Sequence, residues 1–427
     1  MAFEFEIGET IIPETPGTQT VTVSGGFTPK VLLIWGASSP VETDRRTSWG
    51  MASSSSNMVS IGTFTLHGST VSDCTSSRST DLVVFLNGPD LADQAFANLD
   101  AFSSGSFTLD WSKVGEDTTG HGLQWIVLGG SGVSQASVSS FIAPNTPAVH
   151  NHTDPAFTIG APDVAIYMTS NFVSGDLFPK ERDHAVATLG VATGVNNEWT
   201  VGFSSRDAQT TSVAYRANRD DGCVGILDDM SKAWLYRGEH SAFTYASGKG
   251  GHDVNWTVTD TTDKVVDVMF IRGGNYYASL EEETSSLPLG LQSITGVGFQ
   301  PKGVLAASTS DDNTTLSNDG LLTLGAGSTT PDTNVTTWWG DENGETTTNA
   351  RTIQTSGQMY RPHDNDGLQI GNFDMASVNA DGFVVNWDVL GTFPNEWYYL
   401  AIGGPEEVID DRGYNRGLCR GMARGTF

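Results

Sequence analysis

Cysteine and basic residues are both scarce in this chain of 427 residues. The three cysteines, Cys74, Cys223 and Cys419, lie far apart and are odd in number, so they make neither a disulfide framework nor a CxxC metal site. Lysine and arginine number 22 against 50 acidic residues, and charged residues are 17% of the chain, below the roughly 25% of typical globular domains. The formal net charge of -28 disfavours general binding to phosphate backbones of nucleic acids.

Long apolar segments and helical patterns are also missing. No run of roughly 18 apolar residues occurs, so no membrane-spanning segment is expected. The opening residues MAFEFEIGE are acidic and alternating, which is unlike a secretory signal. No apolar stripe has helical spacing over a useful length, and residues 89–99 would form at most one short helix. The chain is long enough for roughly two to four domains.

Short runs of strand-forming residues are what the sequence does contain. Its 49 glycines and many serines and threonines favour short strands and turns. Runs such as VLLIW, FTLDW and QWIVLG are rich in β-branched or aromatic residues and are bounded by Gly, Pro, Asp or Ser. We therefore predict an all-β fold.

Three segments of the chain end in the same way. They read SGSFTLDW before LQWIVLGG, GHDVNWTV before VVDVMFIRGG, and DGFVVNWDV before EWYYLAIGG. Each carries a tryptophan about 16–18 residues before the end of an apolar strand that closes on Gly-Gly: Trp111, Trp256 and Trp387. We expect these tryptophans in the core, because each can bury upward of about 150 Å². The alternative is an exposed platform on which a sugar ring stacks.

The beginnings of the same segments also agree. GFTPKVLLIWG (residues 26–36) matches GFQPKGVLAAS (298–308), and the middle segment has the weaker FTIGAPDVAIYMTS (157–170). Because proline lacks an N–H group, it belongs at the start of a strand, where no ladder hydrogen bond is lost. We expect Phe27 and Phe299 to anchor the incoming chain in the core.

Two further landmarks occur in each segment, a glycine and then an arginine about 26–28 residues later. The glycines are Gly50, Gly190 and Gly325, and the arginines are Arg78, Arg216 and Arg351. The planar guanidinium group suits bidentate hydrogen bonding. Two roles are open for these arginines: a structural one, on a carboxylate or a loop carbonyl, or a binding group repeated at a three-fold-like centre or ligand pocket.

Four landmarks in the same order predict three tandem β-sandwich repeats. The predicted organisation is an N-terminal strand or arm (1–18), three sandwich repeats (19–130, 155–274 and 292–404), two linkers (131–154 and 275–291) and an Arg/Gly-rich C-terminal arm (405–427).

This pattern resembles that of the H-type lectins, which open with an aromatic residue, a proline and an apolar strand and close on a Trp-x-Ala-Ile-Gly strand. The third repeat carries the resemblance best, in Phe299, Pro301, Trp387 and WYYLAIG (397–403), and the middle repeat departs most. The same phrases are similar to those of tailed-phage virion proteins, including tail-fibre tips. The resemblance implies six-stranded sandwiches that assemble as trimers, with sugars bound near subunit boundaries. Three tandem antiparallel sandwiches would then form a pseudo-trimer.

Recognisable catalytic and metal-binding motifs are missing. The sequence has no GxSxG, P-loop or HExxH motif, and no histidine recurs at one position in all repeats. His150-Asn151-His152 is expected in a solvated loop, and the DNDG of residues 364–367 lacks the terminal Glu of a calcium loop. We predict a non-enzymatic protein with no cofactor and no metal site.

The composition changes from acidic to basic after Asp411. The final residues RGYNRGLCRGMARGTF place an arginine at every fourth position: Arg412, Arg416, Arg420 and Arg424. The interspersed glycines would each cost about 1 kcal/mol in a helix, so an extended arm is favoured. A basic arm on an acidic body indicates docking to an acidic neighbouring subunit, and the alternative is a frayed end.

Together these features predict a structural protein on the exterior of a tailed-bacteriophage virion. The first repeat begins near the N-terminus with no trunk or coiled coil ahead of it, which favours capsid decoration over a tail role. The alternative is a tail-associated, carbohydrate-binding protein that recognises the receptor. The expected partners are capsid or tail subunits and, for the alternative, a host surface glycan; neither nucleic acid nor a membrane is expected.

Overall fold

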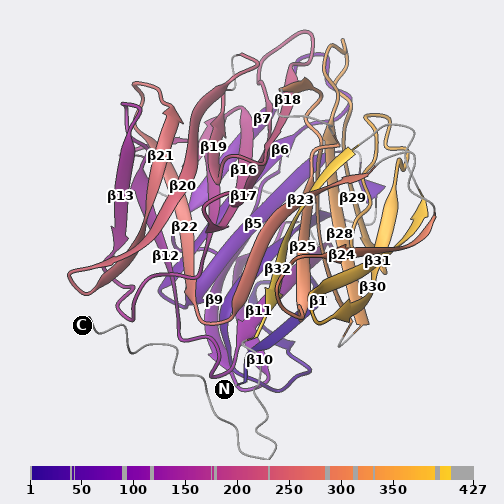
Figure 1. Cartoon of the computed structure of the whole chain (residues 1–427). Helices are drawn as coiled ribbons and strands as arrows, with labels where there is room; N and C mark the ends of the chain where they lie inside the picture. The colour runs from indigo at the N-terminus through magenta and orange to yellow at the C-terminus, as the bar shows by residue number, and fades with distance from the viewer. Residues whose placement is uncertain are drawn as a thin grey trace, which may run out of the picture.

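The computed structural model describes residues 2–38, 41–42, 44–88, 94–115, 120–174, 176, 180–228, 231–283, 289–310, 316–329, 332–389 and 395–404. Every helix or strand assigned in these residues is a β-strand, and the strands form six antiparallel sheets, so the all-β prediction is confirmed. The sheets form three pairs of one large and one small sheet, which we call sandwiches 1, 2 and 3 (Figure 1).

The strand order of each sandwich is as follows. Sandwich 1 has the large sheet β1 (Glu4–Ile11), β11 (Gly122–Gly129), β3 (Pro29–Ser38), β5 (Arg45–Ser54), β6 (Asn57–Thr65), β7 (Cys74–Ser79), β15 (Lys180–Asp183) and the small sheet β2 (Gly17–Thr22), β10 (Ser106–Lys113), β9 (Ala95–Ser103), β8 (Val84–Leu86). Sandwich 2 has the large sheet β12 (Gln135–Ile142), β22 (Lys264–Arg272), β14 (Val164–Val173), β16 (Ala185–Gly194), β17 (Asn197–Ser205), β18 (Ala214–Arg219), β26 (Ser317–Asn318) and the small sheet β13 (Val149–Asp154), β21 (Lys249–Val258), β20 (Trp234–Ala246), β19 (Val224–Leu227). Sandwich 3 has the large sheet β23 (Asn275–Glu283), β32 (Asn395–Gly403), β25 (Gly303–Ser308), β27 (Leu322–Thr329), β28 (Asp332–Asp341), β29 (Ala350–Ser356), β4 (Val41–Glu42) and the small sheet β24 (Gly290–Thr295), β31 (Gly382–Val389), β30 (Asn372–Asn379).

The last strand of each large sheet comes from another sandwich. Strand β15 lies in the chain of sandwich 2 but pairs with β7 of sandwich 1, and β26, from sandwich 3, pairs with β18 of sandwich 2. Strand β4, from sandwich 1, pairs with β29 of sandwich 3. The exchange therefore closes in a circle. Each short strand covers an edge that would otherwise leave N–H and C=O groups unpaired.

Each large sheet is buried on both faces. One face packs on the small sheet of its own sandwich. The other faces of the three large sheets meet in one apolar cluster, which we call the central core. In it the Trp49 ring lies 6.2 Å from the Phe203 ring and 5.9 Å from the Trp339 ring, so all three sandwiches touch. Burial on both faces explains why large-sheet strands read as continuous apolar runs such as VLLIW (31–35).

The tryptophans that recur in the three segments of the sequence are core residues, as predicted. Trp111, Trp256 and Trp387 are each at most 2% exposed and lie on corresponding strands of the small sheets. The Trp111 indole N–H donates to Gln19 Oε1 at 2.9 Å, and Trp387 makes the same bond to Gln292 at 2.6 Å. These positions offer no exposed platform for a sugar ring.

The landmark glycines mark the close approach of the two sheets in each sandwich. A Cβ added to any of them would overlap a backbone carbonyl oxygen of the segment that crosses above it. The glycines are Gly50, Gly190 and Gly325, and the carbonyl groups belong to Val83, Cys223 and Met359, respectively. A backbone oxygen cannot swing aside as a flexible side chain would, so only glycine fits at these positions.

Replacing Gly190 by alanine is therefore expected to lower the free energy of unfolding by about 1–3 kcal/mol, because the added methyl group must push two sheets apart. Gly194→Ala, on the same strand β16, is the control, since its added Cβ meets only the Asn197 side chain at 3.7 Å. Urea unfolding midpoints of the two variants test this. Equal midpoints would contradict the packing argument.

One sequence prediction about local structure is wrong. The segments expected as linkers contain strands: β12 and β13 lie within 131–154, and β23 and the start of β24 lie within 275–291. Within the segment 89–99, residues 95–99 belong to strand β9 and not to a helix, and 89–93 lie outside the described residues. Sandwich 1 has eleven strands, against the six that the lectin resemblance implies.

Candidate functional site

The first of the three candidate arginines is buried between sandwiches 1 and 2. Arg78 on β7 is 2% exposed, and its Nε donates to Asp267 Oδ2 at 2.7 Å. Its Nη2 also donates to the hydroxyl of Ser140 at 2.9 Å. Asp267 and Ser140 lie on β22 and β12 of sandwich 2, so Arg78 joins two sandwiches. This contact fits the structural role.

The other two arginines also bind protein groups. Arg216 on β18 donates to the carbonyl oxygen of Asn318 and lies 3.7 Å from the carboxylate of Asp319, both in the chain of sandwich 3. Arg351 on β29 stays within its own sandwich, where it donates to the carbonyl oxygen of Asp366 and to Asn349 Oδ1.

The three arginines lie on corresponding strands but in different registers. In each large sheet the neighbouring strand has one residue opposite the landmark glycine: Ser60, Thr200 and Thr336 in sandwiches 1, 2 and 3. The arginines pair further along the same strand. Arg78 is opposite Ile61, one residue beyond Ser60; Arg216 is opposite Phe203, three beyond Thr200; and Arg351 is opposite Gly340, four beyond Thr336. The structure therefore does not superpose the arginines or bring them into one pocket.

A different position recurs in register at every junction between sandwiches. Ser76, Arg216 and Thr352 occupy it, each opposite the third residue beyond the one that faces the glycine. The Ser76 hydroxyl donates to the carbonyl of His184 at 2.8 Å, and the Thr352 hydroxyl donates to that of Asp44 at 3.2 Å. Each of these side chains thus donates a hydrogen bond to the backbone of another sandwich, in or next to the strand that this sandwich contributes.

A buried ion pair at one margin of the central core went unnoticed in the sequence. Arg45 is 0% exposed, and its Nη2 donates to the hydroxyls of Thr65 and Ser205, each at 2.8 Å. Its Nη1 lies 3.7 Å from Asp341 Oδ2, and the guanidinium carbon sits 4.3 Å from the centre of the Phe203 ring. Thr65, Ser205 and Asp341 end β6, β17 and β28, the corresponding strands of sandwiches 1, 2 and 3. One arginine therefore binds three sandwiches at once.

Burial governs the electrostatics of this pair. Desolvation lowers the pKa of Arg45, and the nearby Asp341 carboxylate opposes that shift. Desolvation likewise raises the pKa of Asp341, and Arg45 opposes it. Each charge is thus stabilised in a dry site chiefly by the other and by the two hydroxyls. Such a closed pair has a structural role.

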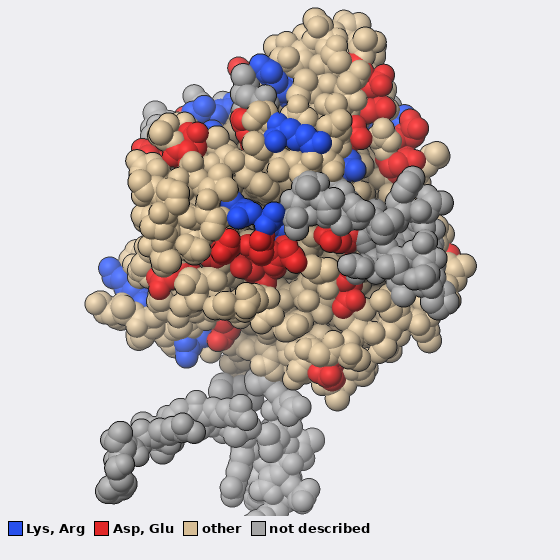
Figure 2. Space-filling view, turned by 45° about the horizontal axis from the view of Figure 1, so that its top comes forward, with Lys and Arg blue, Asp and Glu red and all other residues tan. Residues whose placement is uncertain are grey.

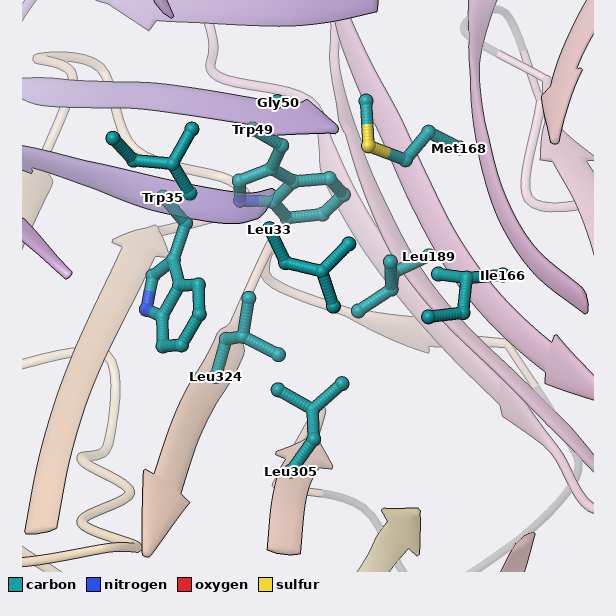
Figure 3. Close-up of a pocket in the computed structure, with 10 residues that line it drawn as sticks. Leu33, Trp35, Trp49, Gly50, Ile166, Met168, Leu189, Leu305 and Leu324 are labelled. Atoms are coloured by element: carbon teal, nitrogen blue, oxygen red, sulfur yellow. The ribbon is translucent and has the colours of Figure 1, made fainter. Parts of the chain in front are cut away.

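An apolar cavity of about 30 Å³ lies within the central core (Figure 3). Corresponding residues of the three large sheets line it: Leu33, Ile166 and Leu305 on β3, β14 and β25, and Trp49, Leu189 and Leu324 on β5, β16 and β27. Figure 3 shows these side chains converging from different strands. Because its lining is almost wholly apolar and its volume is small, the cavity is a packing gap between the sheets.

The histidine motif of the sequence is not in a loop, which corrects that prediction. His150 and His152 lie on strand β13, and His152 stacks on Phe141 with ring centres 4.4 Å apart. Among the described residues no group of three or more His, Cys, Asp or Glu side chains is arranged to hold a metal ion. The described part of the chain also contains no helix long and apolar enough to cross a membrane.

The arginines of the C-terminal arm, Arg412, Arg416, Arg420 and Arg424, lie outside the described residues. Comparison of the sequence with protein-family models and with curated proteins finds no match.

Proposed function

We propose that this chain is a non-enzymatic structural protein of a tailed-bacteriophage particle and that it decorates the outer surface of the capsid. In this proposal the three sandwiches form a pseudo-trimer that binds as one rigid block. The partners are other virion proteins, and the basic C-terminal arm contributes to docking.

The circular exchange of β15, β26 and β4 is the observation that supports the proposal most directly. It ties three similar sandwiches into a closed unit that cannot come apart without breaking strand pairing. Such a unit presents related surfaces three times around one centre, which suits a binding site where three copies of another subunit meet. A shell built from repeated subunits offers such sites.

The composition of the surface also bears on the proposal. On the face drawn in Figure 2, uncharged residues make up most of the surface and the acidic residues lie in separate groups. The recurring aromatic residues Trp111, Trp256 and Trp387 are buried, so they are not the exposed rings on which sugar sites usually rely.

Particles assembled without this protein are expected to burst at lower temperature or lower ionic strength while adsorbing normally to cells. The physical reason is that a protein that binds only the assembled shell lowers its free energy by mass action. Particle integrity and adsorption would be measured in parallel on particles with and without the protein. Intact shells with lost adsorption would overturn the proposal and favour a tail-associated carbohydrate-binding protein.

A further inference from the structure

Sandwich 2 has polar side chains at positions where sandwiches 1 and 3 have apolar ones. Strand registers identify the corresponding residues. His152 stands in place of Val21 and Ile294, His252 in place of Phe107 and Phe383, and Tyr167 in place of Ile34 and Ala306. Since a buried polar group costs free energy unless it is hydrogen-bonded, three such replacements at one place need an explanation.

A cavity of about 120 Å³ is lined by two of these replaced residues, His152 and His252. It sits between the edge strands of the two sheets, β12 and β13, on the left of Figure 1. One part of its lining is apolar, from Phe141, Pro144, Val254 and Trp256 among others, and the rest is three histidines and an asparagine. The exposed side chains of Ile142 and Asn151 lie among the lining residues, so the cavity reaches the surface.

One histidine at this cavity has an unused hydrogen-bonding atom. His252 is 0% exposed, and its Nδ1 lies 2.6 Å from the hydroxyl oxygen of Tyr167. Its Nε2 is buried and has no hydrogen-bond partner among the protein groups. His152 is different, because its Nε2 lies 3.2 Å from the Ser139 hydroxyl. Because His252 is one of the residues that line the cavity, a molecule inside it is the candidate for the missing partner.

The two most deeply buried histidines of the site, His152 and His252, are neutral at neutral pH. Desolvation lowers the pKa of His152 to about 4 and that of His252 well below its usual value. In a chain of net charge -28, these neutral imidazoles offer an anion no positive charge, which favours an uncharged ligand. A neutral imidazole nitrogen donates or accepts according to its tautomer, and a hydroxyl group can match either one.

We propose that this cavity binds a small, uncharged, hydroxylated ring compound of the phenol class, with the hydroxyl group on His252 Nε2 and the ring against Phe141, Val254 and Trp256. The size agrees, because a cavity of about 150 Å³ in another protein takes up benzene. The mix of apolar walls and a few polar groups is typical of small-molecule sites. Sandwiches 1 and 3 would not bind it, since Phe107 and Phe383 fill the corresponding space.

Histidine-ring NMR of the full chain, titrated with phenol, tests the proposal. The His152 and His252 signals are expected to shift together, while those of His67 and His184, which do not line the cavity, stay in place as internal controls. Benzene, which lacks the hydroxyl group, and benzoate, which carries a charge, are expected to bind at least about ten-fold more weakly than phenol.

The double variant H152V/H252F gives sandwich 2 the residues that sandwich 1 has at these positions and is expected to abolish phenol binding. Because the ligand comparison uses only the natural chain, the proposal stays testable even if this variant does not fold. Unshifted His152 and His252 signals at the solubility limit of phenol would overturn it. So would equal binding of phenol and benzene, or a crystal structure in phenol that shows only ordered water in the cavity.

Discussion

Replacing Asp341 by alanine is expected to lower the free energy of unfolding by about 3–5 kcal/mol, because Arg45 would keep a charge with no counterion in a dry site. The carboxylate is 3% exposed and Arg45 is 0% exposed, so water cannot replace the lost partner. Because the Arg45 guanidinium also binds Thr65 and Ser205, the damage falls where all three sandwiches meet. Urea unfolding midpoints of the variant and the natural chain measure the loss.

The double variant R45M/D341T distinguishes a missing counterion from a missing contact. It removes both charges and gives position 341 the threonine that sandwich 1 has at position 65, so it is expected to recover most of the stability that D341A loses. Asp221→Ala is the control for losing an ion pair at the surface: Asp221, paired with Arg219, is 52% exposed, and its loss should cost at most about 1 kcal/mol. A double variant as unstable as D341A would show that the pair itself stabilises the junction.

The sequence pattern predicted the strands that are buried and missed those that are not. Strands such as β3 and β32 contain continuous apolar runs, VLLIW (31–35) and WYYLAI (397–402), because both faces of a large sheet are covered, so they stand out. Strand β13 reads VHNHTD and lies at the edge of its sheet, where five of its six residues are exposed or half-buried. Strands β15 and β26 are only four and two residues long and pair with chain far away. Their pairing depends on where the sandwiches meet, which local composition does not record.

The candidate site was harder to predict for a related reason. Spacing along the chain places Arg78, Arg216 and Arg351 on the correct strands, but loops of different length shift their registers, and a shift of one residue turns a side chain to the other face. An arginine stands at this position only in sandwich 1. The corresponding residues of sandwiches 2 and 3 are Ala185 and Gly320, so the repeat pattern of the sequence does not indicate Arg45. Its importance follows only from three strand ends meeting around it.

The polar core of sandwich 2 extends beyond the cavity to a buried carboxyl group. Glu198 Oε2 accepts the backbone N–H of His240 at 2.6 Å. In sandwich 1 the sulfur of Met58 faces the N–H of Leu99 at the same place. Desolvation raises the pKa of Glu198 to about 8 and lowers that of His240 to about 4. On folding, Glu198 therefore tends to take up a proton, whereas His240 tends to release one.

These opposite shifts predict a maximum of stability near pH 6.5. The three histidines, His152, His240 and His252, have folded pKa values below their usual 6.5, so the unfolded chain binds more protons and stability is lost as the pH falls from about 6.5 towards 4. Glu198 has a folded pKa above its usual 4.5, so its contribution is lost as the pH rises towards 8. Between pH 6.5 and 4.5 the three histidines outweigh Glu198, so stability falls. Between pH 6.5 and 8 Glu198 costs about 2 kcal/mol, and the histidines offset about 1 kcal/mol of this loss, because the unfolded chain still releases protons there.

Substitution by the residues of the other sandwiches separates the two sides of this profile. Glu198→Met copies sandwich 1, so it should remove the decline above pH 6.5 and steepen the loss on the acid side, where Glu198 no longer opposes the histidines. Glu239→Gln removes a neighbouring carboxylate that is only partly buried, so the alkaline decline should remain. The measurement is the urea unfolding midpoint of sandwich 2 from pH 4.5 to 8, followed through the buried Trp256. If the natural chain and the Glu198→Met variant change in stability equally between pH 6.5 and 8, Glu198 stays ionised in the fold, and its burial is relieved by groups other than the His240 amide.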